Sequence, residues 1–267
     1  MPPRRLHLVR HAEGQHNVNW QHEIHDPILT PKGHTQCATL STGFPYHQSV
    51  TNVICSPLKR TIQTTLESFS PSIERLAAAD SQWRIETHPI FQEVGEWQCD
   101  IGSPVPTIKD FVHECAVTFP NINLYKRVDL LDFTHVLALP DWPSKTGLYE
   151  AGRVEERADA ARQYLFDNYS DSQELVIVSH GGFLHYLTND WESYEDAEGT
   201  AWGNTDCHSY EMILDGGVIK LKETQESLDR RKDEQRRKAA ANSQDQGETE
   251  TEHNEIVVGG HPHHHKQ

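Results

Sequence analysis

The stretch Leu6-His7-Leu8-Val9-Arg10-His11-Ala12-Glu13 decides the fold that we expect for this chain. An apolar run of strand type ends at an arginine–histidine pair, and small or polar residues follow as far as Asn17. In open α/β sheets, ligands bind where loops converge outside the carboxyl ends of the strands. Arginine offers a permanently charged, bidentate fork for an oxyanion, and a histidine beside it serves as a nucleophile or a proton carrier. The stretch therefore predicts a first strand, and an anion site at its end requires matching residues from the rest of the chain.

Strands and helices are expected to alternate along the rest of the chain. The further strands expected are Val50–Cys55, Trp83–Ile90 and Glu174–Ser179, and the last is apolar almost throughout, which is typical of burial on both faces. The helices expected between and after them cover residues 31–43, 58–67, 107–119, 150–169 and 183–189. Two runs, 208–214 and 218–222, joined by Asp215-Gly216-Gly217, indicate a hairpin. This order predicts an α/β fold with a mainly parallel sheet and helices on both faces.

Two helix starts carry the same signal, a hydroxyl residue followed by proline. Thr30-Pro31 and Ser56-Pro57 each read as an N-cap with proline at the first helical position. The second start puts Arg60 in the first helical turn, at the same sheet edge as Arg10 and His11. Anions are favoured there, because the free N–H groups and the helix dipole point outward.

Composition limits the classes of function. A chain of 267 residues is expected to form one domain with a tail. The formal net charge of -16 argues against nucleic-acid or membrane binding across the surface. The five cysteines show no CxxC spacing, which argues against a disulfide framework or structural zinc and favours a reducing compartment. Because neither a signal peptide nor a membrane span is apparent, we expect a soluble, cytoplasmic protein.

The expected domain covers residues 1–222, and a charged tail covers residues 223–267. Within the domain, residues 94–149 are rich in proline and aromatic residues. We interpret them as an insertion or lid that sets specificity, and a merely structural excursion fits equally well. The tail predicts a solvated helix running into disorder. Its basic clusters at 230–232 and 236–238 resemble a nuclear-import signal, although a solvated helix is the better interpretation.

Functional side chains follow four strand-to-helix junctions: Arg10 with His11, Arg60, Glu93, and His180. Each alone has an ordinary structural explanation, but together they suit phosphoryl transfer, which requires neutralised phosphate oxygens and in-line attack. The two arginines supply bidentate donors.

The remaining groups would carry the chemistry and complete the phosphate site. A protonated His180 would add another donor, and Gly181 lets the backbone come close. Neutral His11 would attack phosphorus and form a phosphohistidine. Glu93 would give a proton to the leaving oxygen and then activate water, which is typically worth about 10²–10⁴-fold.

These segments resemble the histidine phosphatase superfamily, in the branch that includes cofactor-dependent phosphoglycerate mutase. The matching segments are Leu8–Glu13 with Asn17, Asp26–Thr30 with Gly33 and Gln36, Ser56–Thr64, Gln92–Glu93 with Gly95, and Val178–Gly182. The resemblance implies a three-layer α/β/α fold, no metal and no cofactor. It implies that His11 is the phosphorylated nucleophile, and that Glu93 is the proton donor. It also implies a set of phosphate-binding residues: Arg10, Asn17, Arg60 and His180.

The sequence departs from the family pattern in three places. Ala12 stands where glycine is commonest, and Gly14 stands where a hydroxyl residue is frequent. Glu96, three residues after Glu93, competes for the role of acid.

We predict a metal-independent phosphatase for a small or medium phosphomonoester. A phosphomutase is the alternative, although the segment 94–100 is acidic and aromatic rather than basic. A non-catalytic scaffold is a third possibility, but no residue of the set is lost. The substrate and the oligomeric state are not readable, and residues 94–149 are expected to decide the substrate. The aromatic residues expected either to stack on a ring or to pack as core are Trp97, Phe111, Phe119, Tyr125, Trp142 and Tyr149.

Overall fold

A computed structural model describes residues 2–191, 202–234, 236 and 237 of the chain. The strands are β1 (Arg5–Arg10), β2 (Asn52–Cys55), β3 (Ile85–Thr87), β4 (Leu131–Asp132), β5 (Glu174–Ser179), β6 (Cys207–Asp215) and β7 (Val218–Glu223). The α-helices are α1 (Pro31–Gly43), α2 (Lys59–Ser68), α3 (Ser70–Ala79), α4 (Val105–Thr118), α5 (Thr134–Leu137), α6 (Val154–Asn168) and α7 (Gly181–Thr188). The fold is of the α/β class.

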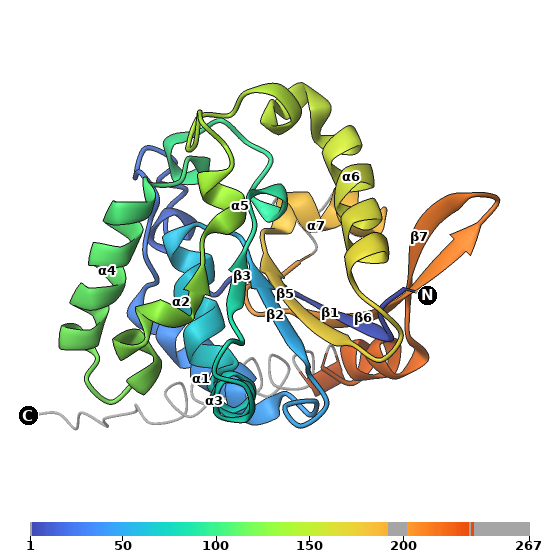
Figure 1. The fold of residues 1–267 in the computed structure, drawn as a ribbon, viewed down its shortest axis with the longest axis horizontal. Coiled ribbons are helices and arrows are strands. Elements are labelled where there is room, and N and C mark those ends of the chain that lie inside the picture. Colours follow the sequence, from blue (N-terminus) through green and yellow to red (C-terminus); the bar gives the residue numbers. More distant parts are fainter. Residues whose placement is uncertain (1, 192–201, 235, 238–267) are drawn as a thin grey trace, which may run out of the picture. The chain divides into compact units, whose positions relative to one another are not determined.

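The strands form one sheet in the order β4-β3-β2-β5-β1-β6-β7 (Figure 1). The strands from β4 to β1 in this order run parallel, while β6 pairs antiparallel with both β1 and β7. In the β1–β5 register, Arg10 lies opposite Ser179, so both strands end at the same level. The predicted mainly parallel sheet is confirmed, and its carboxyl edge brings His11 and His180 together.

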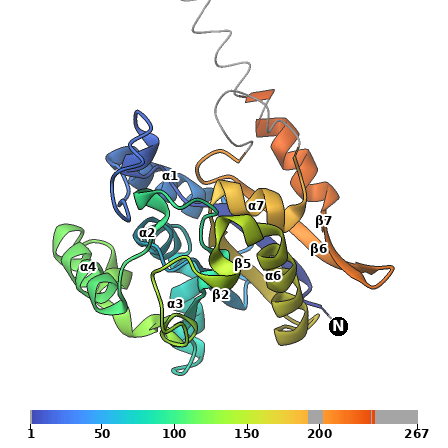
Figure 2. The same cartoon turned by 90° about the horizontal axis from the view of Figure 1, so that it is seen from above.

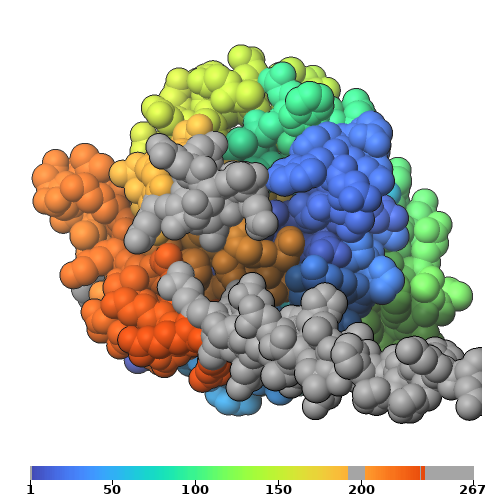
Figure 3. Space-filling view, turned by 180° about the vertical axis from the view of Figure 1, so that it is seen from behind, coloured from blue at the N-terminus to red at the C-terminus, as the bar shows by residue number. Residues whose placement is uncertain are grey.

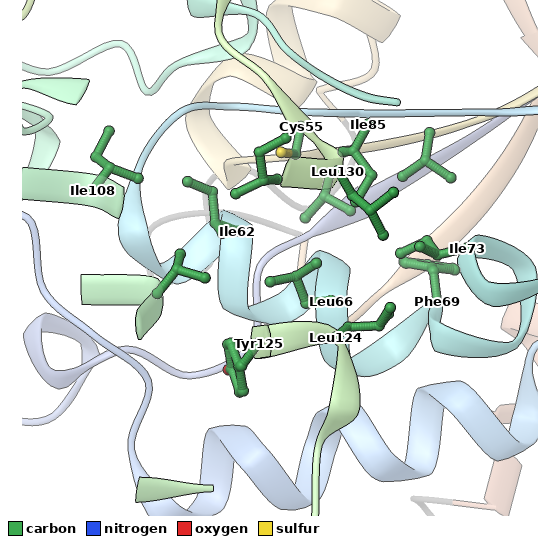
Figure 4. Close-up of a cluster of buried hydrophobic side chains, with 14 of the residues drawn as sticks. Cys55, Ile62, Leu66, Phe69, Ile73, Ile85, Ile108, Leu124, Tyr125 and Leu130 are labelled. Atoms are coloured by element: carbon green, nitrogen blue, oxygen red, sulfur yellow. The ribbon is translucent and has the colours of Figure 1, made fainter. Parts of the chain in front are cut away.

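Alternate side chains of the central strands enter two separate cores. Val176 and Val178 of β5 pack with α2, α3 and α4, in the cluster shown in Figure 4. Leu175 and Ile177 point the other way and pack with α6 and α7. Figure 2 shows these two groups of helices on opposite sides of the sheet. Because β5 is buried along its whole length, its apolar run reports burial on both faces, and the predicted three-layer arrangement is confirmed.

The two predicted caps have different outcomes. Thr30 caps α1 as predicted, and its Oγ1 accepts from the N–H of Gly33 at 3.0 Å. Ser56 was the wrong cap for α2, which begins at Lys59. A carboxyl oxygen of Asp26 accepts the Lys59 N–H at 3.0 Å, and a carboxylate suits a helix N-terminus. The Ser56 hydroxyl is therefore available to His180.

Several element boundaries differ from those predicted from the sequence. The third strand ends at Thr87 because Pro89 starts a 3₁₀ turn (Pro89–Phe91). The α7 helix begins at Gly181, two residues earlier than expected, and α6 begins only at Val154.

The predicted hairpin is confirmed and protrudes from the surface in Figure 3. Gly216 and Gly217 have φ values of 58° and 82°, which a type I′ turn requires at both central positions. The chain divides into two compact units, Met1–Glu223 and Thr224–Gln267. In the second unit, residues 225–234 are helical. The end of the basic cluster 236–238 and the tail expected to be disordered lie outside the described residues.

Helices in the described part of the chain lack the combination of length and apolar character that crossing a membrane requires.

Candidate active site

The carboxyl edge of the sheet brings together four side chains that the sequence singled out. Arg10 ends β1 and His11 follows it, and the His11 N–H donates to the Ser179 carbonyl at 3.0 Å. His180 follows β5, and its ring centroid lies 5.2 Å from that of His11. Arg60, in the first turn of α2, donates to both histidines.

The hydrogen bonds of His11 fix which ring nitrogen carries the proton and which carries the lone pair. Its Nδ1 lies 2.7 Å from the Ala12 carbonyl, which only accepts, so Nδ1 carries the proton. Its Nε2 accepts from Nε of Arg60 at 3.2 Å and therefore holds a lone pair. Burial, and then the charges of Arg60 and Arg10, hold the His11 pKa well below its ordinary 6.5. His11 is a neutral imidazole with its nucleophilic Nε2 beside a guanidinium.

The Arg60 guanidinium is fully buried and held by several partners. Its Nη1 donates to the Cys99 carbonyl at 2.6 Å, and its Nη2 donates to Nδ1 of His180 at 3.0 Å. Nη2 also lies 3.5 Å from Oδ1 of Asp100. Its orientation is set before any ligand arrives, which favours binding because little side-chain entropy is left to lose.

His180 is an acceptor in this state rather than a charged donor. Nδ1 accepts from Arg60, so Nε2 carries the proton and donates to Ser56 Oγ at 2.9 Å. Burial, and then the charges of Arg60 and His11, hold the His180 pKa well below 6.5. The protonated His180 considered from the sequence is therefore not the resting form.

Arg10 and Asn17 are held close to the same site. Arg10 Nη1 donates to the Trp202 carbonyl, and burial lowers the Arg10 pKa although Glu93 and Asp206 raise it. Asn17 Oδ1 accepts from the Gly14 N–H at 3.0 Å. Gly181 is the first residue of α7.

The Glu93 carboxyl lies at the N-terminus of α7. It accepts the N–H groups of Val94 at 2.8 Å, Phe183 at 3.0 Å and Gly182 at 3.3 Å. A Cβ at Gly182 would lie 2.5 Å from Glu93 Oε1, so the backbone of α7 comes this close to the carboxyl group because the residue is glycine. Glu96 is exposed and accepts only a long bond of 3.4 Å from the Ala151 N–H. Glu93 lines the same cavity as Arg10, whereas Glu96 is not among the residues that line it.

A cavity of about 770 Å³ lies beside these groups, and Arg10, Asn17 and Glu93 line it. His11, Arg60 and His180 are buried and do not line it. Two further polar residues in its lining, Asp100 and His16, were not assigned a role from the sequence. Burial and the charge of Glu93 raise the Asp100 pKa, while Arg60 lowers it. The position of Asp100, in a 3₁₀ turn seven residues after Glu93, carries no sequence signal for a site.

The ring centroid of His16 lies 5.5 Å from that of His11. Burial, and then Arg60 and Arg10, lower the His16 pKa to about 2. Its position directly before Asn17 is the one signal that could have pointed to it.

Two cations hold the main chain of Glu93 from another side. Lys145 Nζ donates to the Glu93 carbonyl at 2.6 Å, and Arg157 Nη2 donates to the same oxygen at 3.3 Å. Burial, and then the charge of Arg157, lower the Lys145 pKa to about 8. Through Lys145, residues 94–149 therefore hold the main chain of Glu93 and also form part of the cavity wall.

Most aromatic residues of segment 94–149 serve as core. Phe111 and Tyr125 are buried in the cluster of Figure 4, and Phe119 and Trp142 pack against it. Trp97 differs, because it is exposed and lines the cavity. Trp20 and His22, from the loop before α1, also line the cavity. The sequence had not assigned either of them a role in specificity.

One cluster with metal-ligand potential occurs among the described residues, formed by Glu86, His88 and His135. The sequence had shown no such cluster. Its atoms are already engaged: Glu86 accepts from the Tyr164 and Tyr169 hydroxyls at 2.6 and 2.5 Å. Nδ1 of His88 accepts the Ile90 N–H at 3.1 Å, which leaves the proton on Nε2. None of the three residues lines the cavity above His11.

These features define a class: an α/β protein with paired histidines and arginines at the carboxyl edge of a mainly parallel sheet. The family model of the histidine phosphatase superfamily (branch 1) matches residues 6–100 and 133–227, so the chain belongs to this family. Residues 101–132 lie between the two matched stretches.

Relatives and solved structures of the same kind are found. A probable phosphatase of Schizosaccharomyces pombe is 26% identical over 149 residues, which cover 55% of this chain and 59% of that protein. A phosphoglycerate mutase-like protein of Arabidopsis thaliana is 28% identical over 207 residues, covering 68% of this chain and 72% of that protein. A phosphoglycerate mutase structure from Bacillus anthracis aligns with a TM-score of 0.47 at 17% identity, covering 82% and 92% of the two chains.

Proposed function

We propose that this protein is a metal-independent phosphatase that hydrolyses a phosphomonoester through a phosphohistidine on His11. The observation that carries the proposal is the fixed tautomer of His11, whose Nε2 lone pair lies beside Arg60. Arg10 and Arg60 would hold the phosphoryl oxygens, and Asn17 and the α7 N-terminus at Gly181 would add to the anion site. His180 would donate to the phosphoryl group after taking up a proton at Nδ1, which the dianionic substrate favours.

The reaction proceeds in two displacements. The Nε2 lone pair forms a bond to phosphorus, the bond to the leaving oxygen breaks, and that oxygen takes a proton from a carboxyl group. Water then attacks the phosphohistidine and returns a proton to the same carboxyl, while the N–P electron pair goes back to Nε2. The products are an alcohol and inorganic phosphate.

We propose a phosphatase rather than a phosphomutase because the wall beyond Glu93 is acidic and aromatic, with Asp100 and Trp97. Such a wall does not attract a second anionic acceptor that would compete with water. Residues 94–149 act as the lid of a catalytic domain spanning residues 1–222, with residues 223–267 as a tail. The cytoplasmic location stays a prediction.

Rapid mixing with a ³²P-labelled phosphomonoester is expected to trap an acid-labile adduct on the protein. His11→Ala should abolish the adduct, while the matched variant His113→Ala, at an exposed position of α4, should keep it. An adduct that survives in His11→Ala would refute the proposal. Transfer of the label to an added hydroxyl acceptor, instead of release as phosphate, would identify a mutase.

Dialysis against EDTA should leave the rate unchanged, since the proposed steps use only side chains. Activity that is lost and then restored by a divalent ion would contradict this mechanism.

The acid is tested with leaving groups of different basicity. We propose Glu93 as the donor, so Glu93→Gln should lower kcat/KM for an alkyl phosphate by about 10²–10⁴-fold. It should change much less with 4-nitrophenyl phosphate, whose leaving group needs no proton. Asp100→Asn is the matched comparison, because Asp100 lines the same cavity. If Asp100→Asn showed this pattern instead of Glu93→Gln, the acid would be Asp100.

A further inference from the structure

Three aromatic rings follow one another along the wall of the cavity above the phosphate site. The ring of His22 lies between Trp20 and Trp97, with centroid distances of 6.0 Å and 5.5 Å. All three line the same cavity as Arg10 and Glu93. They come from two segments far apart in the sequence, the loop before α1 and the turn after Glu93. We call them the aromatic row.

The two tryptophans are exposed to an unusual degree. Trp20 is 60% exposed and Trp97 is 64% exposed, although tryptophan is on average highly buried. Large apolar surface left open beside a polar site is typical of ligand binding. By contrast, Phe111 and Tyr125 of the same lid segment are buried in the core.

The backbone around the aromatic row is constrained by its conformation and by a hydrogen bond between the two segments that carry the row. Asn19 and Trp20 have φ values of 57° and 55°, and a bulky side chain in this left-handed region is an outlier. Strained backbone of this kind persists only where surrounding contacts hold it, and it clusters at functional sites. The Cys99 N–H donates to the His22 carbonyl at 3.1 Å, which ties the Trp20 loop to the segment that carries Trp97.

We infer that the leaving group of the substrate carries a planar aromatic ring that stacks on the aromatic row while its phosphate lies against Arg10 and Arg60. This inference rests on the proposed phosphatase function and names the class of its substrate. A flat ring gains from offset or edge contacts with other rings beyond the area that it buries. The cavity of about 770 Å³ has room for both parts of such a molecule.

The arrangement favours a ring over a quaternary ammonium group. Aromatic walls also bind cations, but a cage places several rings around one centre. Here Trp20 and Trp97 flank His22 in a row, with interplanar angles of 44° and 30°. The three rings are therefore spread along the cavity wall instead of surrounding one point, and the exposed surface of Trp20 and Trp97 is available to a ring.

Two substrates that differ only in the planarity of the ring test the inference. Benzyl phosphate and cyclohexylmethyl phosphate both release a primary alkoxide, so the chemical step is closely matched. We expect kcat/KM to be about tenfold higher for benzyl phosphate, the size of effect typical of an aromatic pair. Equal values, or a preference for choline phosphate, would overturn the inference.

Variants of the row separate stacking from simple apolar contact. Trp20→Leu and Trp97→Leu should each lower kcat/KM for benzyl phosphate by several-fold, up to about tenfold, and leave cyclohexylmethyl phosphate nearly unchanged. Trp20→Phe and Trp97→Phe keep a ring and should retain most of the preference. Leu137→Ala removes an apolar side chain that is 70% exposed on α5, away from the cavity lining, and should change neither substrate. Equal losses for both substrates would overturn the stacking role.

Binding without turnover keeps the two proposals apart. In the His11→Ala protein, benzylphosphonate should bind about tenfold more tightly than cyclohexylmethylphosphonate and should change tryptophan fluorescence. If an adduct on His11 forms but neither assay shows a preference for the planar ring, the ring inference fails and the phosphatase stands. If no phosphomonoester forms an adduct, the proposed function fails.

Discussion

Substitution of Gly182 by alanine is expected to remove most of the activity while leaving the fold intact. An added Cβ would lie 2.5 Å from Oε1 of Glu93 and 3.0 Å from Cγ2 of Val94. Ordinary contact begins near 3.4 Å, so the carboxyl group must move by about 1 Å. That movement weakens its bonds to the N–H groups of Gly182 and Phe183.

The expected loss follows from this displacement. A misplacement of about 1 Å at a reacting group costs on the order of 10²-fold in rate. We therefore expect kcat/KM for an alkyl phosphate to fall by about 100-fold. Stability should change little, because alanine in the first turn of α7 improves helix propensity by up to about 1 kcal/mol and so offsets the new contact.

The assay compares steady-state phosphate release with urea unfolding of the same proteins. Gly43→Ala is the matched control, since a Cβ there meets nothing within 4 Å, and it should keep full activity. The double variant Gly182→Ala/Glu93→Asp shortens the acid and should lose less than the product of the two single losses. A Gly182→Ala protein within threefold of the unmodified rate would refute the reasoning, because Glu93 placement would then not limit the reaction.

Three further predictions concern a helix cap and two buried histidines. Thr30→Ala should lower the free energy of unfolding in a urea titration by about 1 kcal/mol, because the Gly33 N–H loses its acceptor. An unchanged urea midpoint would show that the cap contributes nothing to stability. His11 should stay neutral as the pH falls through 6.5. Its ring proton NMR signal, assigned by its loss in His11→Ala, should therefore not shift between pH 8 and pH 5.5. A titration midpoint near 6.5 would be incompatible with the buried site flanked by two cations. Burial, and then His135, lower the pKa of His88 to about 3, so between pH 6.5 and pH 3 only the unfolded chain binds this proton and stability falls as the pH falls. His88→Asn keeps an acceptor for the Ile90 N–H. It should reduce the slope of the unfolding free energy against pH by about 1.4 kcal/mol per pH unit between pH 6 and pH 4. Equal slopes in the two proteins would exclude His88 as the source.

Local patterns predicted the parts of the fold that depend on local physics. The run Glu174–Ser179 predicted a doubly buried strand because both of its faces are apolar, and it is one. Thr30 predicted a cap because a hydroxyl three residues before a free N–H suffices. Ser56 does not cap α2, and the Asp26 carboxyl group, which is distant in the sequence, accepts the Lys59 N–H at the N-terminus of this helix.

The candidate site divides in the same way. Arg10, His11, Arg60 and His180 follow strand ends, and parallel strands bring their ends together, so their convergence was predictable. Asp100, His16 and Trp20 lie on turns and loops whose paths depend on tertiary contacts such as the bond from the Cys99 N–H to the His22 carbonyl. No periodic pattern marks such residues. For the same reason, composition marked residues 94–149 as a distinct segment but did not show which of its side chains lie in the core and which line the cavity.

The position of β1 in the middle of the sheet has a consequence for how the protein acquires activity. His7 on this strand bonds to Glu174 across 167 residues and to Ser209 across 202 residues, and Arg60 bonds to His180 across 120 residues. Such pairings give the domain a high contact order, and the loops between them must close before the contacts stabilise anything. Helices can form early, but His11, the two arginines and His180 meet only when β5 and β6 have docked on β1. During refolding, enzymatic activity should therefore return with the last kinetic phase, later than the helical signal.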